Sequence, residues 1–268
     1  MKRPLLLRML PSRLRHSVYY RFYRARHGEW LPLFEKATLA LAPHISMHGL
    51  IPGCGVSGPL AFLGLYEPAL STSLSRLAQK GGLLVDVGAN MGYFSFLWTA
   101  GNPNARAIAF EASPRNVSIL ENNVVKNGLN GRITLIAKAA GKSSGRIDFD
   151  VGPNHETGWG GIASPRASHS ISVPLVRLDQ ELSEENIDVL KIDVEGADTW
   201  VLYGCEQLLK AKRIRTIFFE QNRHRMEGLG IKPGEAQQFL RDLDYTCEPF
   251  EGNEGEWIAH PKALNSQV

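Results

Sequence analysis

The sequence has few cysteines and no long hydrophobic run. Cys54, Cys205 and Cys247 lie far apart and form no Cys-x-x-Cys pair. This spacing disfavours a zinc site and a disulfide framework, and it is typical of a reducing compartment. No stretch of about 18 apolar residues occurs, so no membrane-spanning helix is expected. Arg8 interrupts the N-terminal apolar stretch and no small-residue cleavage site follows, which disfavours a secretory signal. We therefore expect a cytoplasmic protein.

Acidic residues are missing from the first 28 positions, whereas residues 1–26 contain eight lysines and arginines interleaved with leucine and tyrosine. A basic amphipathic segment of this kind can lie on an anionic membrane surface or bind nucleic acid. The alternative is an ordinary N-terminal helix that packs on the domain. Two expectations therefore stay open for residues 1–26: peripheral contact with the inner membrane surface, and packing on the rest of the chain.

The order of apolar segments predicts an α/β fold. The chain has 268 residues, 43% of them hydrophobic, which is enough for a complete core. A helix over 70–80 is expected to lead into a series of strands separated mostly by helices. These strands are expected near 83–88, 106–111, 133–139, 188–193 and 214–220. Such alternation predicts a parallel sheet with both faces covered.

Other segments extend this plan. Residues 146–151 and 171–176 alternate polar and apolar positions, which indicates added antiparallel strands, and residues 245–259 look like a hairpin. The first 60 residues are expected to be helical or irregular. The predicted division is therefore a helical or irregular N-terminal extension, residues 1–69, followed by one α/β domain, residues 70–268.

The most informative stretch is residues 83–96, a buried strand that continues into a glycine-containing turn and a helix. Gly88 and Gly92 allow a tight turn that lies close to a ligand. Asp86 is at the end of the strand, where a carboxylate opposes a pyrophosphate but suits a positively charged ligand. S-adenosylmethionine is such a ligand, because it carries a sulfonium and an amino group. An ordinary strand-to-helix turn would also explain the glycines alone.

A dinucleotide site is the main competing interpretation of this turn. Its fingerprint requires two further glycines at positions where the chain has Asn90 and Tyr93. Glu111 ends the next strand, 23 residues after the first glycine, where a carboxylate can accept hydrogen bonds from both ribose hydroxyls of a nucleoside. Ser113 and Pro114 follow as an expected helix start with the serine hydroxyl as the N-cap. The pattern indicates adenosine without pyrophosphate.

Two more strands end in acids at the same expected edge. Residues 188–193 deliver Asp193 with Glu195 close behind, and residues 214–220 deliver Glu220 with Asn222 behind it. Ligands of open α/β sheets bind outside the carboxyl ends of the strands. One acid is compatible with a solvated strand end or a helix cap, but four strands that end in acids indicate a site.

These motifs resemble the FkbM family of S-adenosylmethionine-dependent methyltransferases. The resemblance covers roughly residues 80–250 and is carried by Asp86–Ser95, Phe110–Pro114, Asn123, Asn127–Leu129, Leu190–Ala197 and Glu220. It implies a class I methyltransferase Rossmann-like fold, with a mainly parallel seven-stranded sheet and a C-terminal antiparallel hairpin. It also implies methyl transfer to a hydroxyl of a sugar, glycan or secondary metabolite. The cofactor-binding residues it implies are Asp86, Gly88, Asn90, Gly92, Glu111 and Ala139.

The acids at the strand ends have expected chemical roles. An alcohol must lose its proton as it attacks an electrophile. Asp193 is the expected base, and Glu195 is the second candidate, unless it caps the next helix or binds substrate. His155, His169 and His224 are weaker candidates because a single histidine in a loop is more often a surface residue.

A magnesium site is a further alternative. Asp193, Glu220 and Asn222 could supply oxygen ligands to Mg²⁺. The chemistry of methyl transfer from a sulfonium does not demand the metal, and no metal ligand is assigned.

Three classes of function are compatible with these observations. The favoured class is an O-methyltransferase for a small or glycan-like hydroxyl acceptor. A nucleic-acid methyltransferase is suggested by the basic N-terminus. However, residues 193–196 lack the Asn/Asp-Pro-Pro-aromatic sequence that holds a base, and their two acids would face a polyanion, so no nucleic acid is expected as a partner. A non-catalytic cofactor-binding protein is disfavoured by the four strand-end acids.

Overall fold

The computed structural model describes residues 18, 27–163, 170–251 and 255–262. The two expectations for residues 1–26 therefore concern a segment outside the described residues, apart from Val18, which packs against the core. No helix in the described ranges is both long and apolar enough to cross a membrane.

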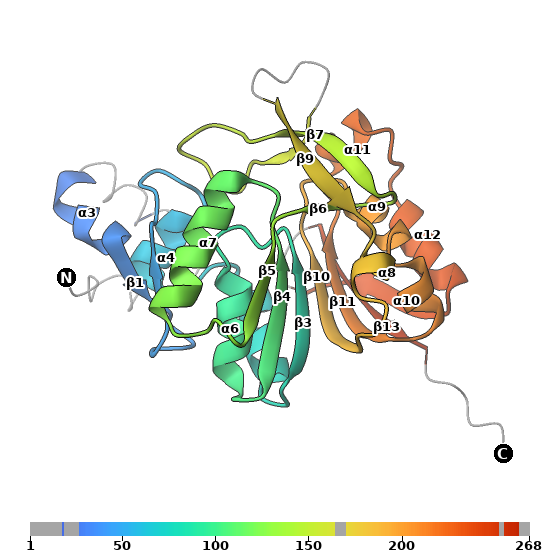
Figure 1. The fold of residues 1–268 in the computed structure, drawn as a ribbon, viewed down its shortest axis with the longest axis horizontal. Coiled ribbons are helices and arrows are strands. Elements are labelled where there is room, and N and C mark those ends of the chain that lie inside the picture. Colours follow the sequence, from blue (N-terminus) through green and yellow to red (C-terminus); the bar gives the residue numbers. More distant parts are fainter. Residues whose placement is uncertain (1–17, 19–26, 164–169, 252–254, 263–268) are drawn as a thin grey trace.

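A seven-stranded sheet forms the centre of the molecule (Figure 1). Its order is β12–β13–β11–β10–β3–β4–β5. The strands are β3 (Gly82–Val87), β4 (Ala105–Phe110), β5 (Ile133–Ile136), β10 (Ile187–Ile192), β11 (Ile214–Glu220), β12 (Tyr245–Pro249) and β13 (Glu256–Pro261). β13 runs antiparallel to both of its neighbours, and the other pairs are parallel. This arrangement confirms the class I Rossmann-like fold and its C-terminal hairpin.

Two apolar cores cover the two faces of the sheet. Alternating side chains of β3 divide between them: Leu84 belongs to one core, while Leu83 and Val85 belong to the other. This division follows from the two-residue period of a strand buried on both faces. The first core contains residues of α5 (Pro68–Ala78), α6 (Tyr93–Gly101) and α7 (Pro114–Lys126). The second contains residues of α8 (Leu178–Glu181), α9 (Asp198–Tyr203), α10 (Glu206–Lys210) and α12 (Glu235–Asp242).

The N-terminal region contains strands that the sequence did not predict. After α3 (His27–Glu35), β1 (Lys36–Thr38) and β2 (Ser46–His48) form an antiparallel pair, and α4 (Ser57–Leu63) follows. The expectation that residues 1–60 are helical or irregular is therefore wrong for these strands. Their residues and those of α4 lie in the same core as α5 and α6. The division at residue 69 stays a prediction.

Two asparagines, Asn123 in α7 and Asn127 at its C-cap, hold β2 in place. Asn123 accepts a hydrogen bond from the His48 amide at 2.7 Å and donates to the His48 carbonyl at 3.0 Å. Asn127 makes the same pair of bonds with Ser46, at 2.9 and 2.8 Å. Each side-chain amide thus replaces a neighbouring strand for one residue of β2, which satisfies backbone groups that need partners when buried. These asparagines belong to the motif that carries the family resemblance.

A second, four-stranded sheet lies beyond the ends of the central strands (Figure 1). Its order is β6 (Ala139–Ala140), β9 (Ser170–Val176), β7 (Gly145–Asp150) and β8 (Gly161–Ile162). The antiparallel pairing of β7 with β9 confirms the two added strands. The predicted strand over 133–139 is too long, because β5 ends at Ile136. A turn follows, and Ala139 then pairs with Leu175 in the second sheet.

Candidate active site

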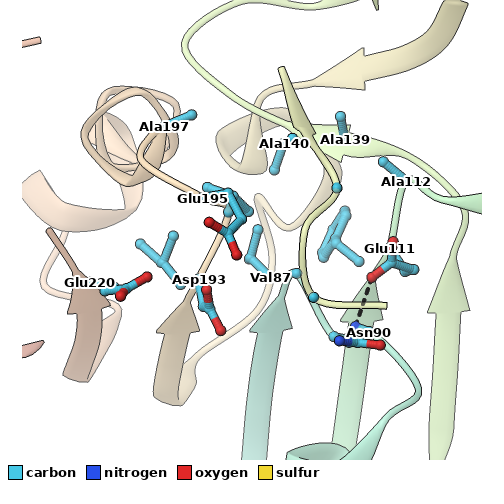
Figure 2. A pocket seen from close by; sticks show the side chains of 18 of the residues that line it. Val87, Asn90, Glu111, Ala112, Ala139, Ala140, Asp193, Glu195, Ala197 and Glu220 are labelled. Carbon is cyan, nitrogen blue, oxygen red and sulfur yellow. Dashed lines mark hydrogen bonds between the residues drawn. The ribbon is translucent and has the colours of Figure 1, made fainter. Parts of the chain in front are cut away.

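A cavity of about 540 Å³ lies at the carboxyl ends of the central strands. It is centred where β3 and β10 are neighbours and their connections diverge to opposite sides, the usual place for ligands in an open α/β sheet. Its lining includes Gly88, Asn90, Glu111, Ala139, Asp193, Glu195 and Glu220. Asp86, Gly92 and Asn222 do not line it. Figure 2 shows Asn90 and Glu111 on one side and the three acids Asp193, Glu195 and Glu220 on the other.

The turn after β3 is held by backbone contacts. The amides of Gly88 and Ala89 both donate to the Phe110 carbonyl at 3.0 Å. Gly88 has a positive φ of 76°, and a Cβ there would lie 1.9 Å from the carbonyl oxygen of Asp193. Glycine is therefore required for two reasons, the left-handed backbone and the close approach of the Asp193 loop.

Glu111 closes this turn with its carboxylate. Its two oxygens accept hydrogen bonds from the amides of Asn90, at 2.7 Å, and Ser113, at 2.8 Å. The residue is only 6% exposed, and burial raises its pKa to about 7 although these amides stabilise the charge. The expectation that the Ser113 hydroxyl caps the helix is wrong. That hydroxyl has no hydrogen-bond partner among the described residues, so it does not cap α7, although Ser113 stands at the N-cap position and Pro114 is the first helical residue as expected.

Asp86 lies beneath the cavity and is fully buried. It accepts a hydrogen bond from the Ser95 hydroxyl at 2.8 Å and lies 3.8 Å from the ammonium of Lys191. Burial raises its pKa from the ordinary value. Gly92 precedes α6 with a φ of 90°, and a Cβ there would lie 2.7 Å from the Phe96 ring. It therefore contributes to the geometry of the turn without contacting the cavity.

Lys191 joins Asp86 to the acid at the end of the next strand. Its ammonium is 3.1 Å from a carboxylate oxygen of Asp193, and the residue is 3% exposed. Burial lowers the pKa of Lys191, but the carboxylates of Asp193 and Asp86 outweigh it and raise the pKa above its usual range. Sequence patterns alone did not indicate a role for Lys191. A charged residue within an otherwise apolar strand was the available signal, since lysine is seldom buried without a partner.

The loop after β10 is shaped around Arg225 of α11 (Arg223–Gly228). Glu195, at a positive φ of 55°, lies 3.5 Å from the Arg225 guanidinium and 3.5 Å from the Asn222 amide. A Cβ at Gly196 would lie 2.5 Å from Cβ of Arg225, so glycine lets α11 approach. Burial, and then the charge of Asp193, raise the pKa of Glu195 to about 7. Glu195 does not cap α9.

Glu67 and Glu220 also line the cavity, and together with Asp193 and Glu195 they form what we call the acidic wall. Burial, together with the charge of Asp193, raises the pKa of Glu220 and that of Glu67 to about 8 each. Glu67 precedes α5 and lies outside the motifs of the sequence, so no pattern predicted it as a site residue. Its φ of 40° is unusual for a non-glycine residue. Glu67, Asn90 and Glu195 are three of the five described non-glycine residues with positive φ, and such strain concentrates at functional sites.

The remaining candidates lie elsewhere. His155 and His224 are exposed and do not line the cavity, and His169 lies outside the described residues. Within the described ranges, no group of three or more His, Cys, Asp or Glu side chains is arranged to hold a metal ion. Asn222 serves as the N-cap of α11, accepting from the Arg225 amide at 3.3 Å.

The central sheet order and the acids at its switch point define the class of the protein: it has the architecture of a class I methyltransferase. The sequence model described as "Methyltransferase FkbM domain" matches residues 86–247. The chain belongs to this family of methyltransferases.

Three curated relatives agree with this assignment. The chain is 30% identical to the 2-O-methyltransferase NoeI of Sinorhizobium fredii (59% of this chain, 74% of the relative). It is 27% identical to the methyltransferase sdnD of Sordaria araneosa (60% and 73%). It is 26% identical to the 31-O-demethyl-FK506 methyltransferase FkbM of Streptomyces tacrolimicus (63% and 74%).

Proposed function

We propose that this protein transfers a methyl group from S-adenosylmethionine to a hydroxyl oxygen of a sugar, glycan or secondary metabolite. The observation that carries the proposal is that one cavity joins the Glu111 turn to the Asp193 carboxylate. Two relatives whose names specify O-methylation support the choice of oxygen.

The described residues fit such a cofactor. The side-chain oxygens of Asn90 and Asn116 are buried, have no hydrogen-bond partner among the described residues, and belong to residues that line the cavity. They are acceptors suited to the N–H and O–H groups of an adenosine. The Glu111 carboxylate is suited to ribose hydroxyls, and Gly88, Asn90 and Ala139 would border the cofactor. Asp86 does not line the cavity, so it would affect the cofactor indirectly, through its ion pair with Lys191, which does.

When bound, S-adenosylmethionine supplies a methyl group on positively charged sulfur, which is strongly electrophilic. Asp193 would accept the hydroxyl proton as the acceptor oxygen attacks. The Lys191 ammonium, 3.1 Å away, would orient this carboxylate. Glu195 is the second candidate, or a ligand of the acceptor. The acidic wall favours neutral or cationic acceptors and opposes a polyanion such as RNA.

A direct test combines binding and transfer. Calorimetry should detect binding of S-adenosylhomocysteine to the protein and should detect no binding of NADH. Incubation with methyl-labelled donor and a host extract should then label a product whose label sits in a methyl ether. Tight NADH binding without S-adenosylhomocysteine binding would refute the cofactor assignment. A label on a nucleobase nitrogen would refute the acceptor class.

We also propose peripheral contact between residues 1–26 and anionic membrane. Each cation near an anionic surface contributes roughly 1 kcal/mol, and salt screens the attraction. The full chain should pellet with anionic vesicles at low salt and separate from them at high salt. A chain that starts near Gly28 should not pellet. Equal pelleting of both chains would refute the contact, and failure of the shorter chain to fold would favour packing on the domain.

A further inference from the structure

The segment between β7 and β8, residues 151–160, borders the cavity, and we call it the strap. Residues 156–160 of the strap line the cavity. Its first half is tied to α7. The guanidinium of Arg115 donates to the carbonyls of Pro153, at 3.0 Å, and Glu156, and the side-chain amide of Asn116 donates to the Thr157 carbonyl at 2.9 Å. This half of the strap is thus fixed beside the turn after β3.

The other half of the strap is tied to the loop after β10. Arg225 donates a hydrogen bond to the Trp159 carbonyl at 3.2 Å, and the same guanidinium lies 3.5 Å from the Glu195 carboxylate. Gly161, the first residue of β8 directly after the strap, leaves room for this contact, since a Cβ there would lie 3.3 Å from Glu195 and 3.4 Å from Arg225. One side chain therefore connects the strap to a candidate catalytic loop.

Trp159 is unusual on this surface. It is 57% exposed and lines the cavity, whereas the other exposed large hydrophobic residues in the described ranges do not line it. These others are Leu31, Leu41, Val125 and Ile171. Leaving a large aromatic ring in water sacrifices the stabilisation that burial would provide. The cavity thus offers an exposed indole together with carboxylate acceptors in its lining, a combination that suits a ring bearing hydroxyl groups.

We propose that Trp159 is the wall against which the ring of the acceptor lies, and that Arg225 is a positioning residue that holds this wall in register with Glu195. The inference rests on the proposed function, because it assigns the acceptor side of the same cavity. It adds two specificity-determining residues of which one, Trp159, carries no charge and takes no part in proton transfer.

The first test uses the acceptor contained in a host extract, through methyl incorporation measured over a dilution series. Because an aromatic contact contributes modestly to affinity, Trp159→Ala should raise the half-saturating extract concentration about fivefold or more, with Trp159→Phe intermediate. The affinity for S-adenosylhomocysteine should not change. Val125→Ala, at a residue 63% exposed on α7, is the matched control. An unchanged half-saturating concentration in Trp159→Ala would overturn the proposal. No incorporation by the unaltered protein would instead refute the proposed function.

The second test concerns Arg225 and needs no acceptor. Arg225→Lys keeps the charge but lacks the fork that reaches both partners. Amide hydrogen exchange in residues 152–160 should become about threefold faster or more in this variant, with S-adenosylhomocysteine present. Unchanged exchange would overturn the positioning role.

A double-mutant cycle separates positioning from a general structural effect. If Arg225 acts on the acceptor through Trp159, Arg225→Lys should raise the half-saturating concentration much less in a Trp159→Ala background than alone. Fully additive effects would overturn this coupling.

Discussion

The two sides of the cavity are built by different physical means. The turn side, Gly88–Asn90 with Glu111, is held by backbone amides of two adjacent strand ends. The acid side, Glu67, Asp193, Glu195 and Glu220, collects side chains from three separate segments. Its charges are ordered by Lys191 and Arg225. Local hydrogen bonds thus shape one side, and long-range packing with mutual charge effects shapes the other. Substitutions should therefore change binding on the turn side, and turnover or pH response on the acid side.

The largest expected effect is on turnover, at the acid side. Asp193→Asn keeps the shape but removes the proton acceptor, so turnover should fall by roughly 100- to 10,000-fold. Affinity for S-adenosylhomocysteine should change by less than about threefold, since the turn side is intact. Asp148→Asn, at an exposed position of β7, is the control. Loss of binding in place of turnover would contradict the separation of the two sides.

The next effect is on stability, where the two sides meet at Lys191. Lys191→Met leaves the buried Asp86 without its ionic partner, so the free energy of unfolding should fall by about 3 kcal/mol. Chemical denaturation measures this loss. Adding Asp86→Asn should recover part of it because the uncompensated charge is removed. A loss below about 1 kcal/mol would show that the pair is not a stabilising link.

The third effect is on binding, at the turn side. Glu111→Ala removes charge-assisted hydrogen bonds, so S-adenosylhomocysteine should bind with a loss of about 1.5–3 kcal/mol. Part of this loss reflects the amides of Asn90 and Ser113, which lose their acceptor. Glu111→Gln should retain part of the affinity for S-adenosylhomocysteine. Calorimetry measures the affinities, with Glu121→Ala on the exposed face of α7 as the control. Unchanged affinity in a folded Glu111→Ala protein would refute the ribose assignment.

The last expected effect is a pH response of the stability of the ligand-free protein, which arises at the acid side. The pKa of Glu195 is raised to about 7 and those of Glu67 and Glu220 to about 8, from an ordinary value of 4.5. The folded state therefore binds more protons than the unfolded state between these values, and stability should fall as pH rises from about 5 to 8. Melting temperatures at a series of pH values measure this fall. Glu220→Gln should make it shallower, and an identical slope would contradict the assignment.

Sequence patterns predicted the turn side almost completely. The strand, the glycines and Glu111 are neighbours in sequence or lie at a characteristic spacing, and the backbone period determines where they meet. Ser113 was the exception: its position at the helix start was predicted correctly, but its hydroxyl accepts no hydrogen bond from the first turn of α7, and its own amide donates to Glu111. Propensity locates a helix start but does not decide which way the capping side chain turns in the packed chain.

The acid side was predicted only in part. Asp193, Glu195 and Glu220 follow strands and were found from that pattern, whereas Glu67 precedes a helix far from any motif. Arg225 and Trp159 are ordinary residues in sequence. Their importance comes from Gly161 and Gly196, which let the strap and α11 approach the Glu195 loop. Contacts of this kind depend on how segments pack, and a linear pattern does not contain that information.

The sequence by itself determined the central sheet, its strand-end acids and membership of a methyltransferase family, because each depends on local periodicity or on short motifs. Only the tertiary structure decided that Lys191 links Asp86 to Asp193, that Asn123 and Asn127 stabilise an N-terminal strand, and that the strap borders the cavity. The physical reason is that buried charges and buried amides must find partners wherever the fold brings them. Those partners are distant in sequence and become neighbours only when the chain is packed.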